Sequence, residues 1–290
     1  MKLIINADDF GLTRDTNRAI KELVKYKTVS STTVMVNMPY AIEIKDFVKF
    51  DHLGIGLHFN LTEGSPITPC HQVKSLVNNL GSFYPYLVFR KRLKKGLIDK
   101  QEIQIELDNQ FQLLESFVLN RITHIDSHQS IHRLGVLYPL IHDFAIEKKI
   151  GIRPGRRYFI KKNDKGISVI KNPLGLSFMQ FTPRRILSEL YYELRDLFLK
   201  NKAFMPKAEL LAVNFKKLET LKNLMSLEFK TIQDTYEISC HPSLSIDELD
   251  VNKTKLLEKR KLEYELLSSK EFVDFTKKNP LVNFKSLIKE

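Results

Sequence analysis

Runs that are typical of strands alternate with helix-like runs over most of this chain, and this alternation limits its fold more than any other feature. The strand-like runs are short and apolar or β-branched, and the helical runs repeat apolar residues every three or four positions. Because many connections are short, the alternation predicts a parallel α/β sheet, either open or closed into a barrel. The expected strands cover residues 2–6, 31–38, 54–61, 122–128, 150–154 and 235–243, and the expected helices cover 14–26, 41–50, about 101–119 and a segment that starts at Pro139.

Two stretches break this rhythm, at residues 63–100 and at about 155–230. Each is longer than a simple connection between a strand and a helix, so we expect lids or substrate-binding insertions there. The sequence has no internal repeat and no low-complexity linker. The expected organisation is therefore a single domain over residues 1–290 that carries these two insertions.

Composition narrows the class of protein. Of the 290 residues, 43% are apolar and 28% are charged, as in an ordinary globular protein, and no apolar run reaches the roughly 18 residues of a membrane span. The opening "MKLIINADDF" contains no signal-peptide core, so we expect the chain to start at Met1. The cysteines, Cys70 and Cys240, lie far apart, which favours a reducing, cytoplasmic compartment.

The net charge of +12 raises the question of an acidic partner. The lysines are spread along the chain, often on helical stretches, and aromatic residues are not interleaved with arginines as they are in proteins that bind single strands. We therefore expect a solvated basic surface, with neither nucleic acid nor a membrane as a partner.

Ionisable residues follow four of the expected strands. A lone histidine in such a place is more often a hydrogen-bonded core residue than a ligand, and a lone aspartate is as often a turn or cap residue. Together, however, carboxylates and histidines at several strand ends would be costly to bury, and a divalent metal offsets that cost. Because the carboxyl ends of parallel strands meet on one face, we expect a metal site there rather than a solvated polar crevice. The residues concerned are Asp8, Asp9, His58, His124, Asp126, His128, His132 and His241.

The residue types in this set suit hydrolysis. One carboxylate and two imidazoles leave open positions on a metal, where the pKa of a water falls toward about 7 and a carbonyl can be polarised. A second carboxylate can take the proton of that water, and a histidine on the opposite side can protonate the leaving group. Adjacent strand residues point in different directions, so we expect Asp8 and Asp9 to have different roles, one as base and one as ligand.

The motifs "INADDFGLT", "STTVMVN", "GIGLHFNLTEG", "THIDSHQSIH" and "CHP" resemble, in order and spacing, those of the YdjC-like carbohydrate deacetylases. The resemblance runs from residue 3 to about residue 245 and is weak between the motifs. It implies a distorted (β/α) barrel of the glycoside hydrolase/deacetylase type, one divalent metal ion, and removal of an acetyl group from an N-acetylated sugar or short oligosaccharide. It also admits a homodimer, which the spread basic surface neither supports nor excludes.

The same resemblance implies a role for each residue. Asp9, His58 and His128 would bind the metal, Asp8 would be the general base, and His241 would be the general acid. Four further residues would support the ligands or line the pocket: Asp126, His132, His124 and Arg153. His124 would orient its neighbours. His132 could equally have a purely structural role, and Arg153 could equally form a salt bridge elsewhere. The metal stays open between Mg and Zn, with Mn and Co also compatible with such ligands.

Two other functions remain open from the sequence. One is a different single-metal hydrolase on the same scaffold, such as a phosphoesterase, although such enzymes often use two metals. The other is a protein that binds a sugar without catalysis. The carboxylates and histidines suffice for one metal only, which disfavours the phosphoesterase, and the complete set of ligands, base and acid disfavours the binding protein.

Overall fold

The computed structural model describes most of the chain. The described residues are 2–163, 166–170, 182–199, 204–212, 217–225, 234–245 and 257–288.

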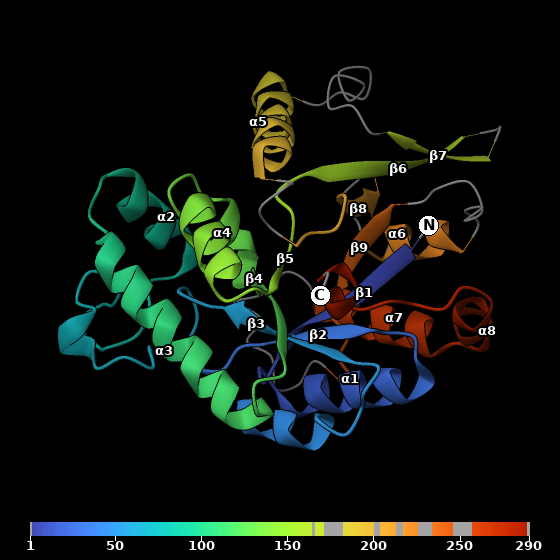
Figure 1. Cartoon of the computed structure of the whole chain (residues 1–290), viewed down its shortest axis with the longest axis horizontal. Helices are drawn as coiled ribbons and strands as arrows, with labels where there is room; N and C mark the ends of the chain where they lie inside the picture. Colours follow the sequence, from blue (N-terminus) through green and yellow to red (C-terminus); the bar gives the residue numbers. More distant parts are fainter. Residues whose placement is uncertain are drawn as a thin grey trace.

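A single nine-stranded sheet forms the centre of the described structure, in the order β5-β4-β3-β2-β1-β9-β8-β6-β7 (Figure 1). Every pairing in it is parallel except that of β6 with β7. The strands are β1 (Lys2–Phe10), β2 (Ser31–Val34), β3 (Gly54–Phe59), β4 (Ile122–Ser127), β5 (Gly151–Ile152), β6 (Arg157–Asn163), β7 (Gly166–Ile170), β8 (Glu209–Ala212) and β9 (Thr235–Cys240).

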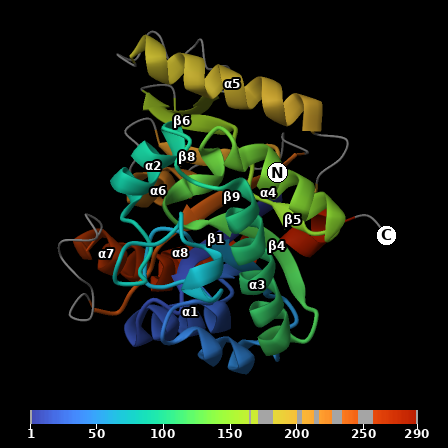
Figure 2. The same ribbon diagram turned by 90° about the vertical axis from the view of Figure 1, so that its left-hand side faces the viewer.

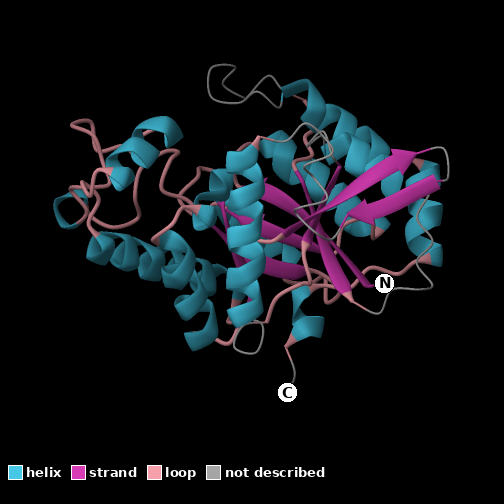
Figure 3. Cartoon of the chain, turned by 90° about the horizontal axis from the view of Figure 1, so that it is seen from above, coloured by secondary structure: helices cyan, strands magenta, loops and turns pink. Residues whose placement is uncertain are grey.

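Helices surround this sheet, as the view from above shows (Figure 3). The α-helices are α1 (Arg14–Tyr26), α2 (Tyr86–Lys94), α3 (Lys100–Val118), α4 (Leu137–Glu147), α5 (Pro183–Leu199), α6 (Lys217–Leu224), α7 (Leu257–Ser268) and α8 (Lys270–Lys278). Short 3₁₀ helices are η1 (Ala41–Phe47), η2 (Cys70–Gln72), η3 (His128–Arg133) and η6 (Phe284–Leu287). Among the described residues, no helix combines the length and the apolar character that crossing a bilayer requires.

The sheet curls back on itself. β5 lies at one end of the strand order and β6 near the other, yet residues 153–156 alone separate these two strands in the chain. Beside this link, the amide of Ile152 donates to the carbonyl of Phe204, which precedes β8. The gap is therefore bridged by the chain and by isolated contacts, and not by a continuous strand ladder. The result is the distorted (β/α) barrel that the resemblance to the deacetylases implied.

The helices form where the sequence predicts them, for identifiable reasons. Thr13 caps α1, because its side chain accepts a hydrogen bond from the amide of Thr16 at 3.0 Å. Asp99 caps α3 in the same way. The predicted apolar stripe of α3 faces the core, from Ile103 through Leu107 and Phe111 to Val118. Burial of such a stripe supplies most of a helix's stability in a protein of this type.

Three expectations need correction. The segment predicted as a helix at 41–50 is the 3₁₀ helix η1, and the strand predicted at 31–38 ends at Val34. The stretch at about 155–230 is not all insertion, because β6, β7 and β8 lie within it and join the central sheet. These three strands were missed because their neighbourhood mixes apolar residues with many lysines and arginines, which hides the strand pattern.

The other long stretch, residues 63–100, is fastened to the barrel through α3. The buried carboxylate of Glu106 accepts hydrogen bonds from the amides of Ile67 and Thr68, each at 2.9 Å. Glu102 accepts another from the amide of Ser75 at 2.7 Å. These bonds satisfy loop amides that would otherwise lack partners, so they fix the path of the stretch.

Candidate metal centre

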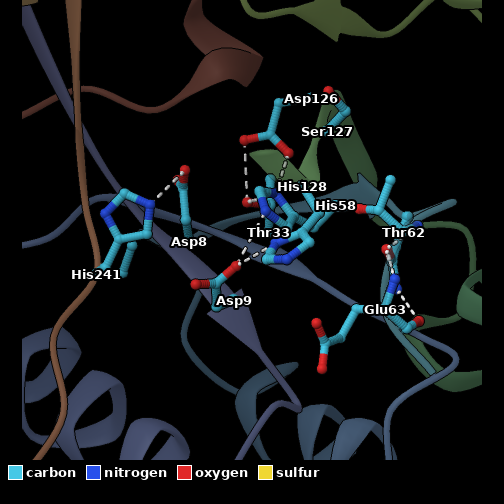
Figure 4. A network of polar contacts seen from close by, with 12 residues as sticks. Asp8, Asp9, Thr33, His58, Thr62, Glu63, Asp126, Ser127, His128 and His241 are labelled. Atoms are coloured by element: carbon cyan, nitrogen blue, oxygen red, sulfur yellow. Dashed lines mark hydrogen bonds and ion pairs between the residues drawn. The ribbon is translucent and has the colours of Figure 1, made fainter. Parts of the chain in front are cut away.

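The predicted polar residues meet at the carboxyl ends of the strands, as the parallel topology requires. Asp8 and Asp9 lie near the end of β1, and His58 is the second-last residue of β3. Asp126 lies near the end of β4, and His128 directly follows that strand. His241 follows β9 and approaches from the other side (Figure 4).

A bulge in β1 brings both adjacent carboxylates into this cluster. Regular alternation would send Asp8 and Asp9 to opposite faces of the sheet. The register of β1 on β2 shifts between Ala7 and Phe10, and Asp9 has a left-handed backbone with φ of 66°. Aspartate tolerates this conformation better than most residues. The local backbone, and not the alternation, therefore gives the two side chains different partners within one site.

Asp9, His58 and His128 form a three-sided cluster that could hold a metal ion. The Oδ1 atom of Asp9 lies 3.2 Å from Nε2 of His58 and 2.9 Å from Nδ1 of His128. Ligand atoms that each sit about 2 Å from a small dication are roughly this far apart. Asp9 and His58 are buried, and the side chain of His128 is 12% exposed, which leaves an approach from solvent.

Asp126 and Thr33 orient His58 from behind. Nδ1 of His58 lies 2.6 Å from Oδ1 of Asp126, and the Thr33 hydroxyl donates to Oδ2 of the same carboxylate at 3.0 Å. A histidine held in this way at Nδ1 presents Nε2 to a metal. Burial by itself lowers the pKa of His58, but the charge and hydrogen bond of Asp126, with help from Asp9, raise it to about 10.

Asp9 has a further partner from far along the chain. Its Oδ2 atom lies 2.5 Å from Nη2 of Arg260, a buried residue of α7. Burial alone would raise the pKa of Asp9, but the charges of Arg260 and His128 hold it well below its ordinary value. Asp9 is therefore ionised, with Oδ2 held by the arginine and Oδ1 turned to the two histidines.

A second group of donor atoms that could hold a metal comes from Asp8, His58 and Asp126. The two carboxylates of this group, however, are already paired with the guanidinium of Arg153. Nη1 and Nη2 of Arg153 each lie 2.8 Å from an oxygen of Asp8, and Nη2 also lies 2.8 Å from Oδ2 of Asp126. Such a two-pronged pair fixes the carboxylate plane. Arg153 thus faces the site, one of the two roles that the sequence left open.

Asp8 stands between Arg153 and His241. Burial would raise its pKa, but the paired guanidinium and the two nearby histidines lower that pKa well below the ordinary value. Nε2 of His241 lies 3.6 Å from Oδ2 of Asp8. The sequence placed the candidate acid on the side opposite the base, whereas the structure places these two groups next to each other.

The remaining predicted residues lie behind this centre. Nε2 of His124 lies 3.0 Å from Oδ1 of Asn6, and its ring stacks on Phe284 at 3.9 Å. Burial, and then the charge of Arg153, keep its pKa well below the ordinary value, so it is neutral. His132 contacts the Ser127 hydroxyl at 2.6 Å through Nδ1. Neither belongs to a ligand group found among the described residues.

Sequence reasoning missed several residues that contact the site, among them Asn6, Thr33, Glu237 and Arg260. Thr33 belongs to the "STTVMVN" motif, but β-branched residues are common in strands, so nothing marked Thr33 as a residue of the site. Glu237, whose Oε1 lies 2.6 Å from Nε of Arg153, interrupts an apolar strand, and a buried acid within such a strand is a usable signal. Arg260 lies in a highly charged helix, where nothing distinguishes it from its neighbours.

The family model described as "YdjC-like protein" matches residues 2–278. Two curated relatives named chitooligosaccharide deacetylase are each 36% identical to this chain. The match to the relative from Proteus mirabilis runs over 164 residues, which is 56% of this chain and 62% of that protein. The match to the relative from Yersinia pestis runs over 157 residues, which is 53% of this chain and 59% of that protein. The match thus spans about three fifths of each relative.

A solved structure shares the fold of this chain. The crystal structure of a proposed cellobiose-phosphate cleavage protein from Enterococcus faecalis superposes with a TM-score of 0.74 at 25% sequence identity. The superposition covers 99% of both chains, so the whole fold is shared. The match of the family model over nearly the whole length decides the assignment: this chain belongs to the YdjC-like protein family.

Proposed function

We propose that this chain is a metal-dependent hydrolase that removes the acetyl group from an N-acetylated sugar or short oligosaccharide. One observation carries the proposal: a carboxylate and two imidazoles converge within ligand distance, next to a second carboxylate that is held separately by Arg153. The class of substrate comes from the curated relatives, which are named for deacetylation of chitooligosaccharides.

Asp9, His58 and His128 fit a divalent metal. Their donor atoms are one carboxylate oxygen and two ring nitrogens, and the hydrogen bond from His58 to Asp126 leaves Nε2 directed at Asp9. This set suits Zn, Mg, Mn or Co. When bound, such an ion supplies a lowered water pKa and a polarised substrate carbonyl.

Asp8 is the general base in this proposal, and Arg153 orients it. Oδ1 of Asp8 accepts hydrogen bonds from Asn6 and Arg153, whereas Oδ2 accepts one from Arg153 and faces His241. Oδ2 is therefore the atom that takes the proton of the attacking water. Because His241 is adjacent, it can pass a proton to the leaving amine and recover one from Asp8.

The stretches at 63–100 and 155–230 shape the pocket in this proposal, within one domain over residues 1–290. A saccharide is the expected partner, and no nucleic acid or membrane is. A cytoplasmic location is the expectation from Cys70 and Cys240, neither of which forms a disulfide.

Acetate release tests the proposal. The protein is stripped of metal with a chelator and then incubated with N-acetylglucosamine and its short oligomers, with and without added Zn, Mg, Mn or Co. We expect acetate only when one of these ions is present. A parallel assay with p-nitrophenyl phosphate tests the alternative function, because a phosphoesterase would hydrolyse this ester. If the protein binds the saccharide but releases no acetate under any metal condition, it is a binding protein and not an enzyme.

A further inference from the structure

Helix α7 contacts the candidate metal centre from far along the chain, and neighbouring elements hold it in place. The helix lies beside α1 in two views at right angles (Figure 1 and Figure 2). The hydroxyl of Tyr264 donates to Oε2 of Glu22 on α1 at 2.5 Å. The buried carboxylate of Glu263 accepts a hydrogen bond from the amide of His241 at 2.6 Å. Neither contact uses the side chain of Arg260, so both can hold α7 when that side chain is changed.

Arg260 is the residue of α7 that contacts the centre directly. Its side chain is 3% exposed, and Nη2 lies 2.5 Å from Oδ2 of Asp9. A guanidinium is costly to bury unless an ionised partner lies beside it, and Asp9 is that partner. In the part of the chain that the structure describes, Nε and Nη1 of Arg260 have no hydrogen-bond partner. Among those residues, the guanidinium therefore makes its hydrogen bond to Asp9.

The two oxygens of Asp9 have separate partners. Oδ1 lies 3.2 Å from Nε2 of His58 and 2.9 Å from Nδ1 of His128. Oδ2 lies instead against Arg260. Figure 4 shows one oxygen joined to the histidines and the other turned away from them. A carboxylate with both oxygens free can bind a cation through both of them. The guanidinium occupies one oxygen here, so Oδ1 alone faces the ring nitrogens.

We propose that Arg260 is a positioning residue that keeps Oδ2 of Asp9 away from the metal, so that Asp9 supplies a single ligand atom. This inference rests on the metal centre of the proposed function. A six-coordinate ion with one ligand atom from each of Asp9, His58 and His128 would have three other positions, and a second carboxylate oxygen would take one of them. Hydrolysis needs such positions for a water and for the substrate carbonyl. Arg260 therefore preserves open positions and weakens metal binding, because two cations beside one carboxylate repel each other.

Binding of Mn²⁺ to the full chain tests the proposal, because the relaxation rate of water protons reports how many water molecules a bound Mn²⁺ holds. Arg260→Met keeps the length of the side chain and removes its charge. We expect the relaxation enhancement per bound ion to fall by roughly a third, since one of three open positions is lost. The dissociation constant for Mn²⁺ should fall on the order of tenfold, because a repelling charge is removed and a ligand atom is gained. A residue that only supports Asp9 would have the opposite effect, since loss of such a residue weakens metal binding by about 10- to 100-fold.

Three further variants control this experiment. Lys261→Met is the matched control, because Lys261 is exposed on the same helix, and it should change neither quantity. Arg260→Lys keeps a charged donor beside Asp9, so it should return the relaxation enhancement toward the parent value. Arg260→Gln removes the charge but keeps a neutral donor, so it should still bind Mn²⁺ more tightly. This variant keeps the test decisive if Arg260→Met does not fold, which circular dichroism determines.

Acetate release separates this inference from the proposed function. In Arg260→Met we expect release that is slower by about 10- to 100-fold, together with the tighter binding of Mn²⁺. An unchanged relaxation enhancement, or weaker Mn²⁺ binding, in this variant overturns the inference and leaves the proposed function in place. A parent protein that binds Mn²⁺ but releases no acetate with any metal contradicts the deacetylase alone, and the relaxation result then still decides the role of Arg260. A parent protein that binds no divalent ion contradicts both.

Discussion

At the scale of single residues, Asp8 and Asp9 are neighbours in sequence but have different partners. Asp8→Asn should leave metal content nearly unchanged and lower the rate of acetate release by about 100- to 10,000-fold, since the amide cannot take the proton of the water. Arg153 keeps Asp126 and Glu237 as partners, so its charge stays compensated. Asp9→Asn should instead lower metal content, because a neutral amide oxygen is a poorer ligand for a dication.

Metal analysis and acetate assays on both variants separate these roles. The comparison also includes the hypothesis that Asp8 is only a turn residue, in which case Asn would replace it with little loss. An active Asp8→Asn protein, or one that has lost its metal, would show that the two carboxylates do not divide their tasks as proposed.

Thr33 offers a sharper test of the orientation of His58. Thr33→Val keeps the shape but removes the hydroxyl that contacts Asp126, His58 and Asn6. Loss of such supporting bonds typically weakens metal affinity or activity by about 10- to 100-fold. Thr32→Val is the control, because its buried hydroxyl donates instead to the backbone carbonyl of Ala7. Isothermal titration with the metal should distinguish the variants, and equal affinities would count against a supporting role for Thr33.

Much of the candidate site could be predicted from sequence, for a specific reason. Asp9, His58 and His128 each stand at a strand end, and parallel strands bring their carboxyl ends together whatever the rest of the fold does. Arg260 could not be predicted, because its contact with Asp9 depends on where α7 packs. The side-by-side position of Asp8 and His241 also depends on packing, and the bulge at Asp9 has no clear sequence signal.

At the scale of elements, α4 carries a buried histidine that should make stability depend on pH. Both ring nitrogens of His142 lack a hydrogen-bond partner among the described residues, and its ring packs 4.5 Å from that of Tyr138. Burial, with a smaller contribution from the charge of Arg195, lowers the pKa of His142 to about 4. In the unfolded chain the pKa of this histidine is near 6.5, so between about pH 4 and pH 6.5 the unfolded chain binds a proton that the folded chain does not bind.

Stability should therefore be retained above about pH 6.5 and fall as the pH drops from there toward 4, by up to roughly 1.4 kcal/mol per pH unit from this residue. His142→Leu should reduce that loss, and the exposed His71→Leu should not. Urea unfolding at pH 7 and pH 5 measures the difference. If the loss between these two pH values is the same in the parent and in His142→Leu, the buried ring is not its source.

Helix α5 shows what periodicity leaves undecided. Its sequence repeats apolar residues at helical spacing, and the stretch around it was expected only as part of an insertion. Periodicity predicts that one face is apolar, but it does not say which face meets the protein. Glu189 and Asp196 point inward because Arg133 donates a hydrogen bond to Glu189 and the amide of Arg156 donates one to Asp196. These contacts depend on tertiary packing.

At the scale of the whole molecule, the stretch 63–100 should behave as part of the barrel. Its amides bind Glu106 and Glu102 on α3, so limited proteolysis should not release it as a stable fragment. Glu106→Ala removes two of these bonds and leaves Ile67 and Thr68 without their partners, so cleavage there should become faster. Gel analysis over time compares the two proteins, with Glu115→Ala, on the same helix, as the control. An intact folded fragment from this stretch would indicate a separate domain.

The position of β1 in the sheet has a consequence for how the protein is made. β1 lies between β2 and β9, and its residue Lys2 pairs with Thr235. At synthesis rates of about 5–20 residues per second, β1 waits on the order of 10–50 s on the ribosome before β9 exists. Throughout that interval one edge of a buried, apolar strand is open to pairing with other chains. A nascent chain stalled before β9 should therefore depend on chaperones, and its release should lead to aggregation rather than to a smaller folded protein.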